Sequence, residues 1–152
     1  MKRRTIESPI GYLTLTEEDG FLTRLDFGGE RAGSDRSELL MEAERQLQAY
    51  FAGQRKTFSL PLRLEGTPFQ RRVWEELARI PYGQTRSYAD VARAIGREKA
   101  SRAVGGANHV NPVPVIVPCH RVVGADGSLT GYGGGLAIKE YLLRLERENG
   151  GK

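Results

Sequence analysis

The chain has 152 residues, of which 39% are hydrophobic and 28% are charged, a composition typical of one soluble domain or of two small lobes that share a core. It has no apolar run of about 18 residues that could cross a membrane, and no apolar stretch follows the basic start as in a secretory signal, so we expect a cytoplasmic protein. The net charge of +4 fits a polyanionic partner. The chain has 18 arginines and 5 lysines, and a coding bias in the genome explains this ratio at least as well as a function does.

Alternating apolar residues predict a β-hairpin near the start of the chain. Residues 11–16 and 21–27 alternate with period two, and Asp19-Gly20 between them is a strong signal for a two-residue turn. A helix is predicted from Ser37 to Gly53. None of these residues carries recognisable chemistry, so we interpret residues 1–62 as a scaffold lobe. The apolar face of the helix is formed by Leu40, Ala43, Leu47, Tyr50 and Phe51.

A linker-like segment, residues 57–66, leads into a second lobe that we place at residues 66–152. The first helix of this lobe begins with Thr67 as N-cap and proline in its first turn, and it ends before Pro81. The chain closes with a helix from about residue 136 to Gly150. This last helix carries the apolar residues Ile138, Tyr141, Leu142 and Leu145.

Two short helices joined by a tight turn are predicted between these ends. Residues 87–96, opened by a Ser-x-x-Asp capping box, and residues 101–108 are typical of a helix-turn-helix. The second helix is unusual, because Gly105 and Gly106 each lower the helix propensity by about 1 kcal/mol relative to alanine. Small residues allow close packing on another helix, or they allow an approach to DNA with Arg102 facing the duplex. Both explanations stay open, since one face of this helix can pack on another helix while the opposite face approaches DNA.

The only cysteine of the chain, Cys119, follows the apolar run 115–117. Three prolines within residues 112–118 exclude a helix, so we predict a short buried strand that ends by holding Cys119 in a rigid turn. One cysteine cannot form an internal disulfide, and with two histidines it cannot make the usual zinc cluster. A lone cysteine is most often a core residue, but the polar neighbours His120 and Arg121 lead us to interpret this one as a nucleophile.

The segment Pro118-Cys119-His120-Arg121-Val122 resembles the active-site signature of the O6-alkylguanine-DNA alkyltransferases, which are direct-reversal DNA repair proteins. The similarity covers residues 69–146 with high specificity and the first lobe only loosely. Some members carry a zinc site in the N-terminal lobe, for which this chain has no ligands, and relatives without the cysteine only bind lesions. Further matches in the family's order and spacing are Ile80-Pro81-Tyr82-Gly83, Ser87-Tyr88, Arg102-Ala103-Val104-Gly105, Asn111-Pro112, Gly131-Tyr132 and Lys139-Glu140.

The resemblance implies an α+β fold, with a small N-terminal RNase H-like α/β lobe followed by a winged-helix-like C-terminal lobe. It implies irreversible, single-turnover transfer of the alkyl group from O6-alkylguanine, and from O4-alkylthymine, in double-stranded DNA to Cys119. The damaged base is flipped out of the duplex, and the alkylated protein is not regenerated. No cofactor or metal is expected. We expect a monomer, and leave cooperative binding along DNA open.

The resemblance also assigns roles to residues. Cys119 accepts the alkyl group, and His120 activates the Cys119 thiol through a water. Glu146 orients the imidazole, and Asn111 holds the turn around the site. Tyr88 assists flipping and hydrogen-bonds the departing guanine. The implied DNA-binding residues are Ser87, Tyr88, Arg102, Ala103, Gly105 and Gly106, and the implied lining of the base pocket is Pro114, Val122, Tyr132 and Gly133.

Elementary energetics are compatible with these roles. Extruding a stacked base costs a few kcal/mol, and a planar guanidinium such as that of Arg102 is well shaped to fill the gap. Lowering the pKa of the Cys119 thiol gains little, because nucleophilicity falls with the pKa, whereas good positioning is worth up to about 7–11 kcal/mol. Two other classes stay open: a non-catalytic DNA-binding regulator in which the cysteine is structural, and a Cys–His hydrolase of esters or peptides.

Overall fold

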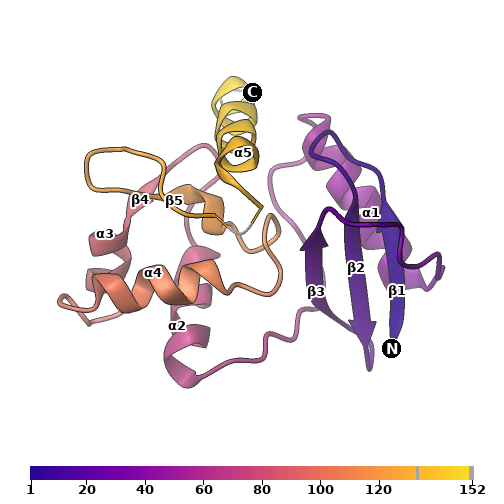
Figure 1. Ribbon diagram of the computed structural model, residues 1–152, viewed down its shortest axis with the longest axis horizontal. Helices are drawn as coiled ribbons and strands as arrows, with labels where there is room; N and C mark the ends of the chain where they lie inside the picture. Colours follow the sequence, from indigo (N-terminus) through magenta and orange to yellow (C-terminus); the bar gives the residue numbers. More distant parts are fainter. Residues whose placement is uncertain (133, 151–152) are drawn as a thin grey trace. The chain divides into compact units, whose positions relative to one another are not determined.

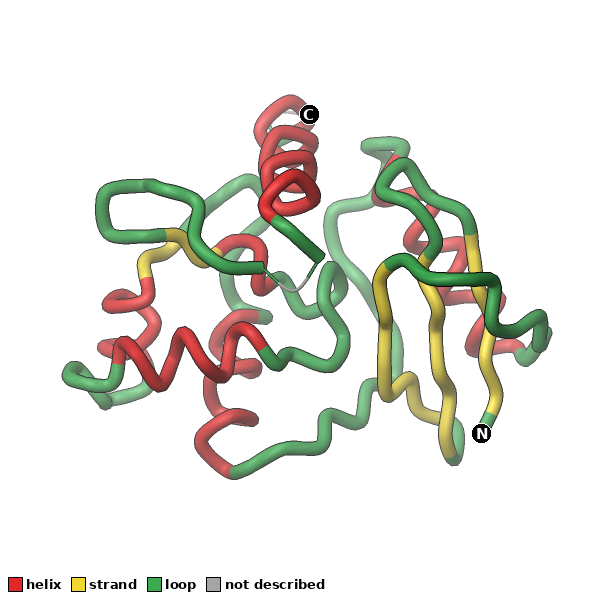
Figure 2. Tube along the Cα trace, in the orientation of Figure 1, coloured by secondary structure: helices red, strands yellow, loops and turns green. Residues whose placement is uncertain are grey.

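The structure is a computed structural model, which describes residues 1–132 and 134–150 (Figures 1 and 2). The chain divides into two compact units, Met1–Glu65 and Gly66–Lys152. Within the described residues, no helix combines the length and the apolar character needed to cross a lipid bilayer.

The first unit contains a three-stranded antiparallel sheet in the order β1-β2-β3. Its strands are β1 (Lys2–Ile6), β2 (Leu13–Glu18) and β3 (Phe21–Phe27). The hairpin predicted between β2 and β3 is confirmed, with Asp19 and Gly20 at φ of 51° and 83°, as a tight turn of this kind requires. Most of β1 was not predicted from the sequence, because its exposed basic residues protect a sheet edge but do not alternate with apolar ones.

Helix α1 (Glu38–Phe51) packs against the sheet and lies behind the strands in Figure 1. Ser37 caps the helix by accepting a hydrogen bond from the backbone N–H of Leu40, and the predicted apolar face is confirmed as buried. Gln46 is buried on the same helix, because its amide exchanges two hydrogen bonds with the backbone of Ser59. The segment after α1 is therefore held onto the first unit.

The linker predicted at residues 57–66 belongs largely to the first unit. Leu22, at the start of β3, exchanges backbone hydrogen bonds with Pro61 and Arg63. Gly66 then begins the second unit, where a Cβ atom would lie 2.5 Å from the ring of Trp74. The segment is extended, as a linker would be, but its backbone groups are paired with β3.

The second unit is built on three helices that pack on one another, α2 (Pro68–Leu77), α3 (Tyr88–Ala94) and α4 (Ser101–His109). Both predicted N-termini are confirmed, since Thr67 and Ser87 each form a capping box with the residue three positions on. The indole N–H of Trp74 in α2 donates to the carbonyl of Ala107 in α4, 2.8 Å away. This bond joins the helix-turn-helix to the helix before it.

A two-stranded parallel ladder connects this helical part to the cysteine segment. Strand β4 (Arg86–Ser87) precedes α3 directly, and strand β5 (Val122–Val123) follows the 3-10 helix η1 (Cys119–Arg121). Helix α5 (Leu136–Asn149) completes the unit and packs on η1. The predicted helix is confirmed, and of its apolar residues Leu142 is buried while Ile138, Tyr141 and Leu145 are half-buried. The residues that it buries are Lys139, Leu142, Leu143 and Glu146.

The strand predicted before Cys119 was wrong. Residues 113–117 form a buried turn, closed by a hydrogen bond from the backbone N–H of Val117 to the carbonyl of Val113. Val115 adopts a φ of 71°, which is strained for a β-branched residue. The neighbouring prolines lack the N–H groups that a strand needs, and burial of the three valines holds the turn instead.

Candidate active site

Cys119 is delivered by a tight backbone turn at Pro118. The φ and ψ of Pro118, −81° and 65°, are those of an inverse γ-turn, and the N–H of Cys119 donates to the carbonyl of Val117 at 2.8 Å. Asn111 donates its side-chain amide to the same carbonyl at 2.8 Å and accepts the N–H of Val113 at 3.0 Å. Asn111 therefore fixes both ends of the turn that precedes the cysteine.

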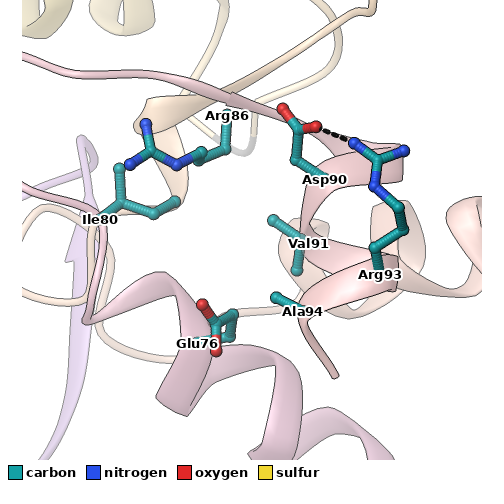
Figure 3. A pocket seen from close by; sticks show the side chains of 7 residues that line it. All are labelled: Glu76, Ile80, Arg86, Asp90, Val91, Arg93 and Ala94. Atoms are coloured by element: carbon teal, nitrogen blue, oxygen red, sulfur yellow. Dashed lines mark hydrogen bonds and ion pairs between the residues drawn. The ribbon is translucent and has the colours of Figure 1, made fainter. Parts of the chain in front are cut away.

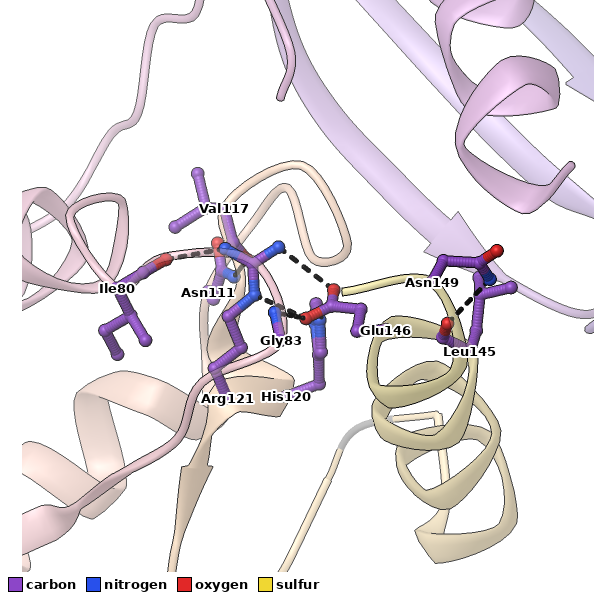
Figure 4. Close-up of polar contacts among 9 residues, drawn as sticks. All are labelled: Ile80, Gly83, Asn111, Val117, His120, Arg121, Leu145, Glu146 and Asn149. Carbon is purple, nitrogen blue, oxygen red and sulfur yellow. Dashed lines mark hydrogen bonds and ion pairs between the residues drawn. The ribbon is translucent and has the colours of Figure 1, made fainter. Parts of the chain in front are cut away.

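The next two residues meet Glu146 of α5 in a buried polar network (Figure 4). Nε2 of His120 lies 2.7 Å from Oε2 of Glu146, and Arg121 binds both carboxylate oxygens, at 2.8 and 3.0 Å. Arg121 also donates to the carbonyl of Ile80 at 2.6 Å, and the N–H of Gly83 donates to Oε1 of Glu146 at 3.1 Å. The network joins the turn after α2, the cysteine segment and α5.

The protonation states in this network follow from its geometry. Burial by itself would raise the pKa of Glu146, but the hydrogen bonds and the positive charge that it receives lower the pKa well below the usual range. Burial lowers the pKa of His120, so its ring is neutral at neutral pH. Because the ionised carboxylate can only accept, Nε2 of His120 carries the ring proton. Its Nδ1 is a buried acceptor to which no described residue donates.

The sulfur of Cys119 is a thiol at rest. The residue is 4% exposed, and burial raises the pKa of its thiol to about 11, against the opposing effects of Asn111, Lys139 and Tyr132. At neutral pH about one molecule in ten thousand carries a thiolate. A nearby base must therefore take the proton when the sulfur reacts, and the neutral imidazole of the adjoining His120 is of the right chemical type.

Lys139 is a site residue to which the sequence analysis gave no role. It is fully buried in α5, and its ammonium donates to the carbonyls of Val122 and Thr130 at 2.6 and 3.0 Å. Burial lowers its pKa, while the charge of the ammonium acts on the Cys119 sulfur. The sequence could have indicated this residue, because Lys139 precedes Glu146 by seven residues and this spacing puts both side chains on one face of a helix.

The helix-turn-helix presents part of the predicted DNA-binding set to solvent. Arg102, Ala103 and Gly106 are exposed along α4. Gly105 faces α3, where a Cβ atom would lie 3.8 Å from the ring of Tyr88. The hydroxyl of Ser87 is occupied as the N-cap of α3.

Tyr88 points toward the loop that follows β5. Its hydroxyl lies 2.6 Å from Oγ1 of Thr130, another residue that the sequence analysis did not select. Of the predicted base-pocket residues, Pro114, Val122 and Tyr132 are buried, and burial, together with the neighbouring Cys119 sulfur, raises the pKa of the Tyr132 hydroxyl. Gly133 lies outside the described residues. The assignment of these residues to a base pocket stays a prediction.

A separate hollow of about 350 Å³ lies between α2 and α3 and contains none of the predicted site residues (Figure 3). Each of its charged side chains has a partner: Arg93 pairs with Asp90, Glu76 with Arg79, and Arg86 with Gln84. We assign no chemistry to this hollow. Its lining consists of Glu76, Ile80, Arg86, Asp90, Val91, Arg93 and Ala94.

Comparison with known proteins covers both units. Residues 1–64 match the family model of the 6-O-methylguanine DNA methyltransferase ribonuclease-like domain, and residues 68–148 match that of the DNA binding domain. The constitutive methylated-DNA–protein-cysteine methyltransferase of Bacillus subtilis (strain 168) is 51% identical over 154 residues, which cover 94% of this chain and 93% of that protein. The methylated-DNA–protein-cysteine methyltransferase of Methanosarcina barkeri (strain Fusaro / DSM 804) is 50% identical, over 95% of this chain and 96% of its own.

Among solved structures, a crystal structure of Mycobacterium tuberculosis OGT in complex with DNA matches with a TM-score of 0.91 and 49% identity, over 98% of this chain and 94% of that chain. The resemblance noted in the sequence is thereby confirmed, as is the fold class, with a small antiparallel-sheet lobe followed by a helical DNA-binding lobe. The chain belongs to the 6-O-methylguanine DNA methyltransferase family.

Proposed function

We propose that the protein repairs DNA by moving the alkyl group of O6-alkylguanine, and of O4-alkylthymine, from the damaged base to Cys119. The observation that carries this proposal is the buried pair of a thiol and a neutral imidazole, in which Glu146 holds Nε2 of His120 and leaves Nδ1 as an acceptor. Family membership supports the same chemistry, since the relatives are methylated-DNA–protein-cysteine methyltransferases.

The reaction balances without a cofactor. The S–H bond of Cys119 breaks, and its proton passes through a water to Nδ1 of His120. The sulfur attacks the alkyl carbon while the bond from that carbon to O6 breaks, and its electrons stay on the guanine. The guanine anion takes up a proton from solvent, helped by a hydrogen bond from Tyr88, and His120 returns the thiol proton to solvent, so the protons balance. The thioether product is a stable bond for which the chain offers no cleavage chemistry, so each molecule acts once.

Binding to duplex DNA is assigned to the second unit. Residues 66–152 contain 13 of the 23 basic residues and 8 of the 19 acidic ones, a net charge of +5, whereas residues 1–65 contain 10 basic and 11 acidic residues. A positive charge confined to the unit with the helix-turn-helix favours a phosphate backbone as partner. The exposed face of α4 would enter the groove, with Arg102 taking the place of the extruded base.

Extrusion of the base follows from the burial of the sulfur. Because Cys119 is 4% exposed, a base stacked within a duplex cannot bring its alkyl carbon to the sulfur. Pro114, Val122, Tyr132 and Gly133 are proposed to receive the flipped base. We assign the reaction to a monomer in the cytoplasm, associated with the nucleoid if the source is a prokaryote.

A mass measurement on the intact chain tests the proposal. The protein is incubated with a duplex that contains O6-methylguanine, and a Cys119→Ser variant is treated in parallel. One methyl group gained per molecule of the unaltered protein, mapped to Cys119 and absent from the variant, is the expected result. An unchanged mass with retained DNA binding would instead indicate a regulator. Repeated turnover of a soluble ester or peptide would indicate a hydrolase.

A further inference from the structure

The carboxylate of Glu146 receives hydrogen bonds from His120, Gly83 and Arg121, and Arg121 supplies two of them. Oε1 accepts from Nε of Arg121 and from the N–H of Gly83, while Oε2 accepts from Nε2 of His120 and from Nη2 of Arg121. The side chains of Arg121 and Glu146 are 7% and 1% exposed. This is a bidentate ion pair shielded from water, whose two charges cancel within the core.

The other groups around the imidazole do not duplicate this role. Lys139 of α5 acts on the ring through its charge, but it donates to the carbonyls of Val122 and Thr130. Tyr82 lies against the guanidinium of Arg121, 5.7 Å from ring centroid to Cζ. Cys119 is the thiol whose proton is to be moved. Helix α2 also packs on η1, and the residues that it buries are apolar, namely Val73, Trp74 and Leu77.

Removing the charge of Arg121 would leave a buried carboxylate uncompensated, and such a group takes up a proton. If the proton goes to His120, the imidazole becomes an imidazolium with hydrogen on both nitrogens. If it goes to Glu146, the new O–H donates to Nε2, so the ring proton moves to Nδ1. Either route places a proton on Nδ1, the atom that must be empty to receive one.

We propose that Arg121 is a positioning residue for alkyl transfer: by neutralising Glu146 it keeps the ring proton of His120 on Nε2 and leaves Nδ1 free to accept the thiol proton. The use of Nδ1 as the proton acceptor rests on the proposed function. The location of the ring proton does not, and it can be measured without any reaction.

The first measurement is nitrogen NMR of the two histidine rings, in the unaltered protein and in Arg121→Met. In the unaltered protein we expect Nδ1 of His120 to be unprotonated at neutral pH, and in the variant we expect it to carry a proton. His109, exposed at the end of α4, gives a second ring signal in the same spectrum for comparison. An unprotonated Nδ1 in the variant at neutral pH would overturn the proposal.

A charge-conserving variant covers the case in which Arg121→Met does not fold. Arg121→Lys keeps a positive charge that can neutralise the carboxylate of Glu146. Nδ1 is therefore expected to be unprotonated in this variant at neutral pH. A proton on Nδ1 in Arg121→Lys would show that the charge beside Glu146 does not set the position of the ring proton, and would overturn the proposal.

The second measurement is the pH dependence of transfer from free O6-benzylguanine. At neutral pH we expect alkyl transfer by Arg121→Met to be at least about tenfold slower than transfer by the unaltered protein, as when the pKa of the proton-accepting group rises by one unit or more. The rate of the variant should recover as the pH rises. An equal loss at every pH would indicate a purely structural role and contradict the proposal. If the unaltered protein takes up no alkyl group, the proposed function fails, while the NMR result still decides the role of Arg121.

Discussion

Asn111 donates its side-chain amide to the backbone carbonyl of Val117 at 2.8 Å, and so ties the start of the cysteine segment to the residue two positions before Cys119. The bond encloses Val115, whose positive φ would otherwise relax toward an extended conformation. The position of the sulfur therefore depends on one buried amide rather than on a strand.

We expect Asn111→Ala to lower the free energy of unfolding by about 1–3 kcal/mol, because the buried N–H of Val113 loses its partner and the buried carbonyl of Val117 keeps only the bond from Cys119. Transfer from free O6-benzylguanine should slow as well, since the sulfur is no longer held in place. Asn149→Ala is a matched control, because Asn149 donates to the carbonyl of Leu145 at the same 2.8 Å but lies half-buried at the end of α5 (Figure 4). Equal losses of stability in urea denaturation of both variants would contradict this assignment.

Arg102→Ala is expected to slow repair of an O6-methylguanine duplex more than reaction with free O6-benzylguanine. The free base needs no extrusion, so only the duplex reaction depends on a side chain that fills the gap. Arg144→Ala removes the same charge from an exposed position on α5 and serves as control. Single-turnover rates on both substrates decide the point: if Arg102→Ala slows the two reactions equally, Arg102 has no part in flipping.

Gly106→Ala separates the two explanations for the glycines of α4. A Cβ atom at Gly106 would meet no atom within 4 Å, so packing in the free protein does not require glycine there. Alanine should raise helix stability by about 1 kcal/mol. If α4 approaches DNA closely, the affinity for duplex should fall although the melting temperature rises. Gly105→Ala, which faces the Tyr88 ring, is the comparison, and an unchanged affinity for Gly106→Ala would exclude close approach at this residue.

The neutral state of His120 predicts a pH dependence of stability. Burial lowers its pKa in the folded protein, whereas a histidine in the unfolded chain has a pKa of about 6.5. Below that pH the unfolded chain binds a proton that the folded chain does not, so the free energy of unfolding falls by up to about 1.4 kcal/mol per pH unit. Glu146, whose pKa is lowered, begins to act only below about pH 4.3, where an unfolded glutamate is protonated.

Urea denaturation between about pH 7 and pH 5 checks this dependence. The slope of the free energy of unfolding against pH should flatten in His120→Asn. His109→Asn, a change at the exposed histidine, is the control. A slope in His120→Asn as steep as in the unaltered protein would show that another group causes it.

Local structure was predicted well wherever a short sequence motif determines the backbone conformation. Thr67 begins a helix as an N-cap followed by proline, Ser87 begins one as its capping box indicates, and Asp19-Gly20 makes the expected turn. The family was likewise recognisable from the residues around Cys119. In these places the physical cause lies within four or five neighbouring residues, so the sequence contains it.

Prediction failed where distant residues decide the conformation. The burial of Lys139 and Glu146 in α5 could not be predicted from the pattern of the helix, because only their partners on η1, on β5 and on the following loop make it favourable. The failure at residues 115–117 was a local one: the run has the composition of a strand, but the neighbouring Asn111 and the prolines bend it into a turn. Arg121 and Thr130 were left without roles because their contacts join segments that are far apart in the chain.

The ladder between β4 and β5 has a consequence for protein engineering. Main-chain bonds pair Arg86 with Val122 and Ser87 with Val123, so the entry to α3 is anchored beside η1 without help from outward-facing side chains. A library randomised at exposed positions of α3 and α4 should therefore keep the reactive centre intact. Selection from such a library can alter the preferred neighbouring bases of the lesion while the rate on the free nucleobase stays constant.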